Sequence, residues 1–204
     1  MRLFLICLLC VITMPTVTFA QADVCDGAGH HLIARYAQSG DAQAQFQLSQ
    51  DLAHDACSAE NRTEALLWLH RAAAQNHSEA SFLLGVRYLV GLDVTEDRAR
   101  GLALLEQAAQ GGHLEAQFQF AMIQLQSGTS PERHAQALYW LGAAAYQGET
   151  KAALALGHIY ADGLHGIARQ DCWASAWFTA AQILAQEAGI DVSALIPHDL
   201  RCDL

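Results

Sequence analysis

The segment that decides the fold runs from His77 to Gly112 and reads HSEASFLLGVRYLVGLDVTEDRARGLALLEQAAQGG. Its first part places apolar residues at Ala80, Leu84 and Tyr88, the spacing of one helix face rather than the alternation of a strand. Gly91 follows that face, as a glycine commonly does at the end of a helix. A second apolar run with helical spacing then leads to the final glycine pair. The segment therefore predicts two helices joined by a short connector.

The apolar positions of this segment recur along the chain at intervals of 36 residues. A fixed period of this size is typical of a solenoid, in which each unit buries its apolar face only against its neighbours. We therefore predict an all-α solenoid of stacked helix-turn-helix repeats, with the tryptophans Trp68, Trp140 and Trp177 packed in its core. The recurring residues are Ala44, Ala80, Ala116 and Ala152 at one position, and Phe46, Phe82, Phe118 and Leu154 at another.

The period also predicts how the chain is divided. Four repeats account for most of its 204 residues, a single helix is expected to cap the amino end, and a short tail follows the array. The predicted limits are 1–22 for a signal peptide, 23–40 for the capping helix, 41–76, 77–112, 113–148 and 149–188 for the four repeats, and 189–204 for the tail.

The first residues have the order of a secretory signal peptide. Arg2 precedes an unbroken apolar stretch from Leu3 to Ile12, and small residues follow at Ala20 and Ala22, so cleavage is expected after one of these two alanines. The apolar stretch is shorter than the roughly 20 residues that span a bilayer. We therefore expect an exported protein without membrane insertion, located in the periplasm or, alternatively, secreted.

Four cysteines remain after the predicted signal peptide, namely Cys25, Cys57, Cys172 and Cys202. An even number in an exported chain favours disulfides over metal ligands or free thiols. Sequence alone leaves three pairings open. Because a repeat contacts only adjacent repeats, we expect Cys25 to pair with Cys57 and Cys172 with Cys202, one bond at each end.

The charge balance excludes some classes of partner. Without Arg2, ten Lys and Arg side chains face 21 Asp and Glu side chains, a formal net charge of −11. Nucleic acids and anionic lipids both require basic patches. We therefore expect neither as a partner, whereas a basic protein segment would suit this charge.

The repeats resemble a known family at several positions. The family pattern is approximately A-x-x-x-L-G-x-x-Y-x-x-G, followed by W-x-x-x-A-A-x-x-G, and it belongs to the Sel1-like repeats, relatives of the tetratricopeptide repeats. The third repeat has Gln124 in place of the tyrosine, and the first repeat matches least. The resemblance implies right-handed superhelical stacking and a role in protein–protein interaction. The clearest matches are Ala80, Leu84, Gly85, Tyr88 and Gly91 in the second repeat, and Ala152, Leu156, Gly157, Tyr160 and Gly163 in the fourth.

The sequence offers no catalytic motif. It has neither a G-x-S-x-G elbow nor a glycine loop followed by lysine. The histidines His77 and His113 are one period apart, which favours exposed turn residues, and the group of His158, Asp162 and His165 is expected to be a solvated helix end rather than a metal site. We therefore expect no catalytic residue, cofactor or metal. A cell-wall hydrolase or amidase with an unrecognised surface site remains the alternative.

The expected function is that of an exported, non-enzymatic scaffold or adaptor that binds another protein or an extended peptide in the cell envelope. In stacked hairpins the first helix of each unit lines the inner face. The polar residues of these helices are therefore the candidates for partner binding, namely Gln43, Gln47, Gln50, Arg87, Gln117, Gln119 and Gln124.

Overall fold

The computed structural model describes residues 30–54, 59–126, 130–197, 200 and 202. Within these residues the chain forms nine α-helices, two short 3-10 turns and no strand. The helices are α1 (His30–Gln38), α2 (Ala42–His54), α3 (Ala59–Ala74), α4 (Ser78–Val90), α5 (Arg98–Gln110), α6 (Leu114–Gln126), α7 (Pro131–Tyr146), α8 (Thr150–Asp162) and α9 (Asp171–Glu187), and the 3-10 turns are Leu164–Gly166 and Ser193–Leu195.

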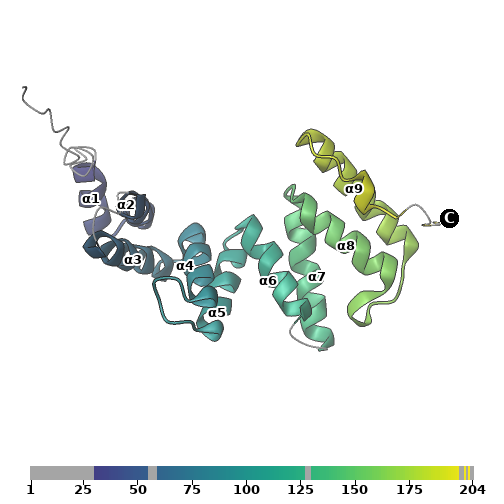
Figure 1. Cartoon of the computed structure of the whole chain (residues 1–204), viewed down its shortest axis with the longest axis horizontal. Coiled ribbons are helices and arrows are strands. Elements are labelled where there is room, and N and C mark those ends of the chain that lie inside the picture. The colour runs from purple at the N-terminus through teal and green to yellow at the C-terminus, as the bar shows by residue number, and fades with distance from the viewer. Residues whose placement is uncertain (1–29, 55–58, 127–129, 198–199, 201, 203–204) are drawn as a thin grey trace, which may run out of the picture.

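The helices are stacked in chain order. Each helix packs against the one before it and the one after it, with the closest pairing within α2–α3, α4–α5, α6–α7 and α8–α9. The chain follows an arc from α1 at one end to α9 at the other (Figure 1). The prediction of an all-α repeat fold is therefore confirmed.

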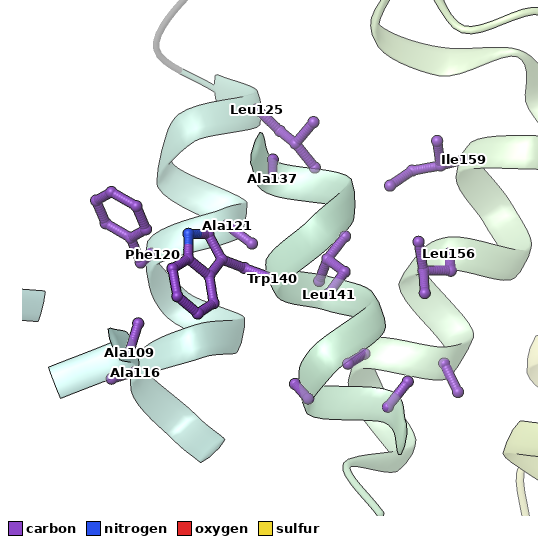
Figure 2. Packing of buried hydrophobic residues seen from close by; sticks show 14 of the residues in the cluster. Ala109, Ala116, Phe120, Ala121, Leu125, Ala137, Trp140, Leu141, Leu156 and Ile159 are labelled. Carbon is purple, nitrogen blue, oxygen red and sulfur yellow. The ribbon is translucent and has the colours of Figure 1, made fainter. Parts of the chain in front are cut away.

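The core consists of the positions that recur in the sequence. Ala80, Ala116 and Ala152 have no exposed surface, and these small side chains lie where neighbouring helices meet. Larger side chains fill the space between layers, and Figure 2 shows Trp140 of α7 directed toward Phe120 of α6. The predicted core position is confirmed for Trp68, which is 6% exposed, and for Trp140, which is 9% exposed. Trp177 is only half-buried and packs against the cluster that contains Trp140.

Two glycines illustrate why the repeat pattern needs this residue type. Gly91 ends α4 in the left-handed region, with φ of 72°, and its N–H donates to the carbonyl of Arg87. Gly157 lies inside α8, where an added Cβ would come within 2.5 Å of the ring of Phe178 in α9. The first glycine provides a backbone conformation and the second allows two helices to approach closely.

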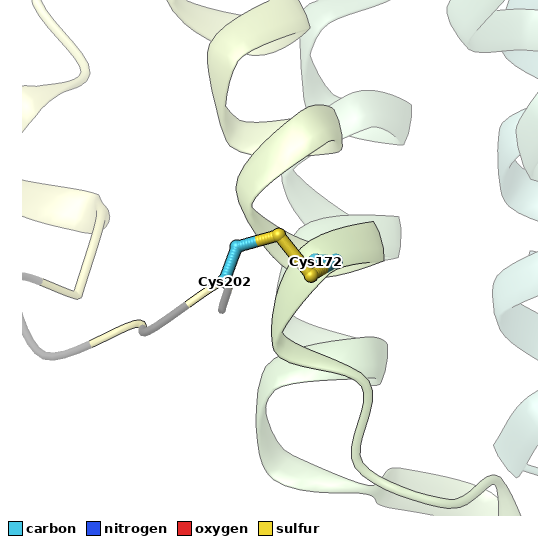
Figure 3. Close-up of a disulfide and its surroundings, with 2 residues drawn as sticks. All are labelled: Cys172 and Cys202. Carbon is cyan, nitrogen blue, oxygen red and sulfur yellow. A yellow bond between two sulfur atoms is a disulfide. The ribbon is translucent and has the colours of Figure 1, made fainter. Parts of the chain in front are cut away.

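A disulfide holds the carboxyl end of the chain. Cys172 at the start of α9 is bonded to Cys202, with an S–S distance of 2.01 Å (Figure 3). Between these cysteines the chain returns along α9, and Ile196 and Leu200 pack against the cluster that contains Phe178. The predicted signal peptide and the two remaining cysteines, Cys25 and Cys57, lie outside the described residues. Among the described helices none has the length and apolar character needed to span a membrane.

Candidate partner-binding surface

The structure contradicts one of the seven predicted binding residues. Gln117 in α6 is only 3% exposed. Its side-chain Nε2 donates to the carbonyl of Ala109 at 3.2 Å, and its Oε1 accepts from Nε2 of Gln147 at 3.0 Å. The expectation that Gln117 faces solvent is therefore wrong, because one end of its amide binds the preceding repeat and the other end binds Gln147 of its own repeat.

The same arrangement occurs two periods earlier. Nε2 of Gln45 donates to the carbonyl of Ala37 at 3.1 Å, and Oε1 of Gln45 accepts from Gln75 at 2.8 Å. Gln45 is likewise buried. These amides add a second hydrogen bond to carbonyl groups at the ends of α1 and α5, which also accept the backbone N–H of Gly40 and Gly112 in the turns that follow. They are structural residues of the repeat junctions.

At the second junction, different side chains bind the corresponding carbonyl group. Ser81 replaces glutamine at this position, and Nε2 of Gln107 donates both to the carbonyl of Ala73 at 2.6 Å and to Oγ of Ser81 at 2.7 Å. The carbonyl at the end of α3 is thus bound by a side chain from α5 instead of one from α4.

Three other predicted residues lie on the surface and contact a neighbour on their own segment. Nε2 of Gln47 donates to Asp51 at 3.0 Å, and Nε2 of Gln119 donates to Glu115 at 2.9 Å. The guanidinium of Arg87 forms an ion pair of 2.7 Å with Asp93, which follows α4. A partner would have to compete with these exposed contacts, each of which contributes little to stability.

Two further candidates take part in contacts between helices. Oε1 of Gln43 lies 2.9 Å from Nε2 of His77, the residue that precedes α4. Nε2 of Gln124 donates to Gln136, whose own Nε2 lies 3.4 Å from a carboxylate oxygen of Glu106. Gln124 stands at the tyrosine position of the family pattern, so this chain of polar groups from α6 to α7 and α5 replaces an aromatic contact.

Gln50 is the candidate whose surroundings fit a binding role best. It is exposed and lines a small cavity of about 40 Å³ together with Leu83 and Arg87, so α2, α3 and α4 all contribute to the walls. The structure thereby brings two predicted residues, Gln50 and Arg87, to one place. It also adds Leu83, which a search for polar residues could not find.

Apolar residues complete the surface around these glutamines. Val86 of α4 and Met122 of α6 are half-buried, and both stand in the 36-residue register of Gln50. Val90, at the end of α4, is 65% exposed. We call the solvent-facing residues at these positions the first-helix stripe. Its members are Gln47, Leu83, Gln119 and Ala155 in one register, Gln50, Val86, Met122 and His158 in the next, and Val90 at the end of α4.

The histidines His77 and His113 have a role that the sequence did not indicate. Each immediately precedes a first helix, and its Nδ1 accepts a backbone N–H, from Ala80 at 3.3 Å and from Ala116 at 3.2 Å respectively. Nδ1 must be unprotonated to accept, so the proton resides on Nε2. Both residues are half-buried. The predicted turn positions of the two histidines are confirmed, but their rings are half-buried and cap the helices that follow instead of being exposed.

The remaining histidine cluster does not form a metal site. The ring of His158 contacts Phe178, with centroids 5.0 Å apart, whereas the ring of His165 contacts His134, with centroids 5.7 Å apart. Across the described residues, no three His, Cys, Asp or Glu side chains are placed to hold a metal ion. His30 and His54 neighbour Cys25 and Cys57, which the structure does not describe.

Comparison with known proteins places this arrangement of helices in a family. The model of the Sel1 repeat matches residues 42–77, 78–113, 114–149 and 150–172. Members of this family generally act as scaffolds for protein interaction. The comparison with curated proteins found no match.

Two solved structures resemble the chain over most of its length. One is a protective antigen of uropathogenic Escherichia coli described as displaying an SLR fold, with a TM-score of 0.65 and 27% identity over 76% of this chain and 33% of that one. The other is a Sel1 repeat protein from Oxalobacter formigenes, with a TM-score of 0.65 and 27% identity over 78% of this chain and 47% of that one. The chain thus spans about a third to a half of these relatives. With its four matched repeats and this fold, the chain belongs to the Sel1 repeat family.

Proposed function

We propose that this protein is an exported, non-enzymatic scaffold that binds a segment of another protein along the first-helix stripe. The observation that carries the proposal is the composition of the stripe, in which two exposed amides, Gln47 and Gln50, and the half-buried amide of Gln119 share their registers with half-buried apolar side chains of the other repeats. Amides provide both donors and acceptors for a peptide backbone, and apolar side chains provide anchors. Family membership supports the same role.

The chemistry of the partner follows from the charge of the chain. The formal net charge of the full sequence is −10, so electrostatic attraction favours a partner segment with lysine or arginine and raises its rate of association. The cavity between Gln50, Leu83 and Arg87 is small and suits the tip of one side chain rather than a whole ligand.

Export is part of the same proposal. The disulfide between Cys172 and Cys202 suits an oxidising compartment, and the sequence of residues 1–22 has the order of a signal peptide. We place the mature protein in the periplasm, with repeats at 41–76, 77–112, 113–148 and 149–188 between a capping helix and a disulfide-bound tail. The segment from 23 to 40 carries the capping helix, and the tail begins at 189.

The experiment that tests the binding face uses two matched exposed apolar residues. Val90 belongs to the first-helix stripe and is 65% exposed, whereas Leu67 of α3 lies on a second helix and is 49% exposed. Each is changed to glutamine, and the variants are used with the parent protein to capture partners from envelope extract under non-reducing conditions. Captured proteins are identified by mass spectrometry.

We expect Val90→Gln to reduce the amount of captured partner and Leu67→Gln to leave it unchanged. Loss with Leu67→Gln alone would place the partner on the second helices and contradict the proposed face. If the bait captures no protein but retains cell-wall fragments, the scaffold proposal is wrong and a glycan-binding or hydrolytic role takes its place.

A further inference from the structure

A second cavity lies away from the first-helix stripe. It has a volume of about 690 Å³, and its walls come from the end of α6, the first half of α7 and the loop that joins α8 to α9. The start of α7 and this loop lie on the same edge of the arc (Figure 1). The apolar walls include Leu125, Leu138 and Ile167. A volume between about 300 and 1,000 Å³ with mainly apolar walls is typical of a ligand site.

Two imidazoles provide polar groups in this apolar cavity. His134 of α7 and His165 of the α8–α9 loop both line it, and their ring centroids lie 5.7 Å apart with an angle of 58° between the ring planes. Few polar groups in an otherwise apolar cavity fix the orientation of what binds there. An imidazole N–H is a donor in either charge state, so it suits an acceptor group such as a carboxylate.

The backbone of His165 is in an uncommon conformation. Its φ is 57°, in the left-handed region, between Gly163 with φ of 66° and Gly166 with φ of 75°. Glycine adopts this region without steric cost, whereas a residue with a Cβ is disfavoured there. The loop uses glycine at two of these three positions, and both His165 and Gly166 line the cavity. Histidine adopts this region more readily than most residues with a Cβ, as asparagine and aspartate do at Asn76 and Asp93. In this loop the conformation places the His165 ring in the wall of the cavity.

We propose that this cavity binds the carboxy-terminal residue of a partner polypeptide, an inference that rests on the proposed protein-binding function. The apolar side chain of that residue packs against Leu125, Leu138 and Ile167, and its carboxylate accepts a hydrogen bond from His165. The ring of His134 positions the ring of His165. In an apolar carboxy-terminal residue, the side chain and the carboxylate are attached to the same Cα. One residue can therefore contact both the apolar walls and the imidazole.

The test measures binding of a fluorescein-labelled Ser-Gly peptide that ends in leucine with a free carboxylate. Two control peptides are identical except that one carries a carboxy-terminal amide and the other ends in serine. The protein variant is His165→Gly, which removes the imidazole and relieves the left-handed backbone, so the fold is retained or stabilised. Fluorescence anisotropy gives the Kd for each combination.

We expect the free leucine carboxylate to bind the parent protein. The amide and His165→Gly should each weaken binding about tenfold or more, since a hydrogen bond to a charged group contributes on that scale. The serine ending should weaken binding about tenfold or more because it removes the apolar side chain that is buried against the walls. Equal binding of the acid and the amide, or an unchanged Kd in His165→Gly, would overturn the inference, and so would the absence of binding by all three peptides.

The outcome is separable from that of the proposed function. A partner that depends on Val90 but is insensitive to His165→Gly and to truncation of its own last residue would leave the scaffold in place and remove this cavity from it. Binding of the leucine peptide to the Val90→Gln variant as to the parent would show that the two surfaces act independently.

Discussion

The imidazole of His113 stacks on the ring of Phe82 across a junction between repeats, with centroids 4.3 Å apart and an angle of 22° between the rings. One period earlier His77 stacks on Phe46 with centroids 4.7 Å apart. In each case the same ring caps the helix that it precedes. One side chain therefore both starts a helix and joins it to the preceding repeat.

This dual role predicts a graded response to substitution. His113→Ala removes the cap and the stacking contact, and we expect it to lower the free energy of unfolding by about 1–3 kcal/mol. Asparagine is a strong N-cap residue, so His113→Asn should lose only the stacking and the 3.1 Å contact of Nε2 with Glu79, and it should cost less than His113→Ala. Urea denaturation followed by circular dichroism measures both. Equal losses in the two variants would mean that His113 does not act as a cap.

Acidification should weaken the junction at His77. Burial lowers the pKa of this histidine from its ordinary value of 6.5, and the carboxylates of Glu79 and Asp41 oppose that shift without reversing it. Burial and the nearby Arg100 also lower the pKa of His70. The unfolded chain therefore binds more protons than the folded chain just below pH 6.5. Stability from these groups is fully present above pH 6.5 and is lost as the pH falls below that value.

The measurement is the urea midpoint at about pH 8 and about pH 5.5, above and below the titration of histidine. The parent protein should lose more stability on acidification than His77→Asn, which keeps a capping side chain but has no titrating ring. Acidic groups titrate in both proteins, so the difference between the two isolates the histidine. Parallel pH profiles would refute the assignment.

Two helical glycines should respond in opposite ways to substitution by alanine, because one lies against a neighbouring helix and the other does not. Gly157→Ala would place a Cβ 2.5 Å from the ring of Phe178, and we expect this overpacking to cost about 1–3 kcal/mol. Gly142 in α7 has no neighbouring atom within 4 Å of an added Cβ. Gly142→Ala should therefore stabilise the protein by up to about 1 kcal/mol through helix propensity.

Thermal denaturation of the two glycine variants gives the sign of each change. The further substitution Phe178→Leu, made in the Gly157→Ala background, tests the cause of the loss. If the ring is the obstacle, the double variant should be less destabilised than the sum of its parts. Strict additivity would exclude a direct clash between the two side chains.

Removal of the disulfide should loosen the end of the array. Cys172 and Cys202 are separated by 30 positions in the sequence. Loss of such a bond typically lowers the free energy of unfolding by about 2–4 kcal/mol. We expect the double variant with serine at both positions to melt at a lower temperature. Limited proteolysis should cleave first near Ile196, which packs against the Phe178 cluster. A melting curve identical to that of the parent would show that packing alone holds the tail.

The repeat fold could be predicted because residues of the same type occupy the same core position in successive repeats. Alanine at 80, 116 and 152 and an aromatic or leucine residue at neighbouring positions bury the same surface in each unit, so periodicity alone identified them. Trp68 and Trp140 were predicted correctly for the same reason. Burial of apolar side chains depends mainly on local spacing, which the sequence displays directly.

The binding surface was harder to predict, because polarity does not determine exposure. Gln117 is buried since its amide meets the carbonyl of Ala109 at the end of another helix, a contact that depends on how two helices meet. The recurrence of glutamine at Gln45 and Gln117, two periods apart, was the one available signal. Val86 was missed for the opposite reason, because an apolar residue on a helix is normally assigned to the core.

The amide contacts at the junctions give the array a direction. Gln45, Gln107 and Gln117 all belong to the later of the two units that they join, and each binds the carbonyl of an alanine at the end of the earlier one. These acceptors, Ala37, Ala73 and Ala109, recur at every period. Each of the first three units therefore supplies the amide donor for its own junction, whereas the fourth has Ala153 at the position of Gln45 and Gln117. Recombination that removes the second unit would bring Gln117 to the carbonyl of Ala73, which is one period before Ala109, so this shorter array would need no redesign of the surfaces that remain.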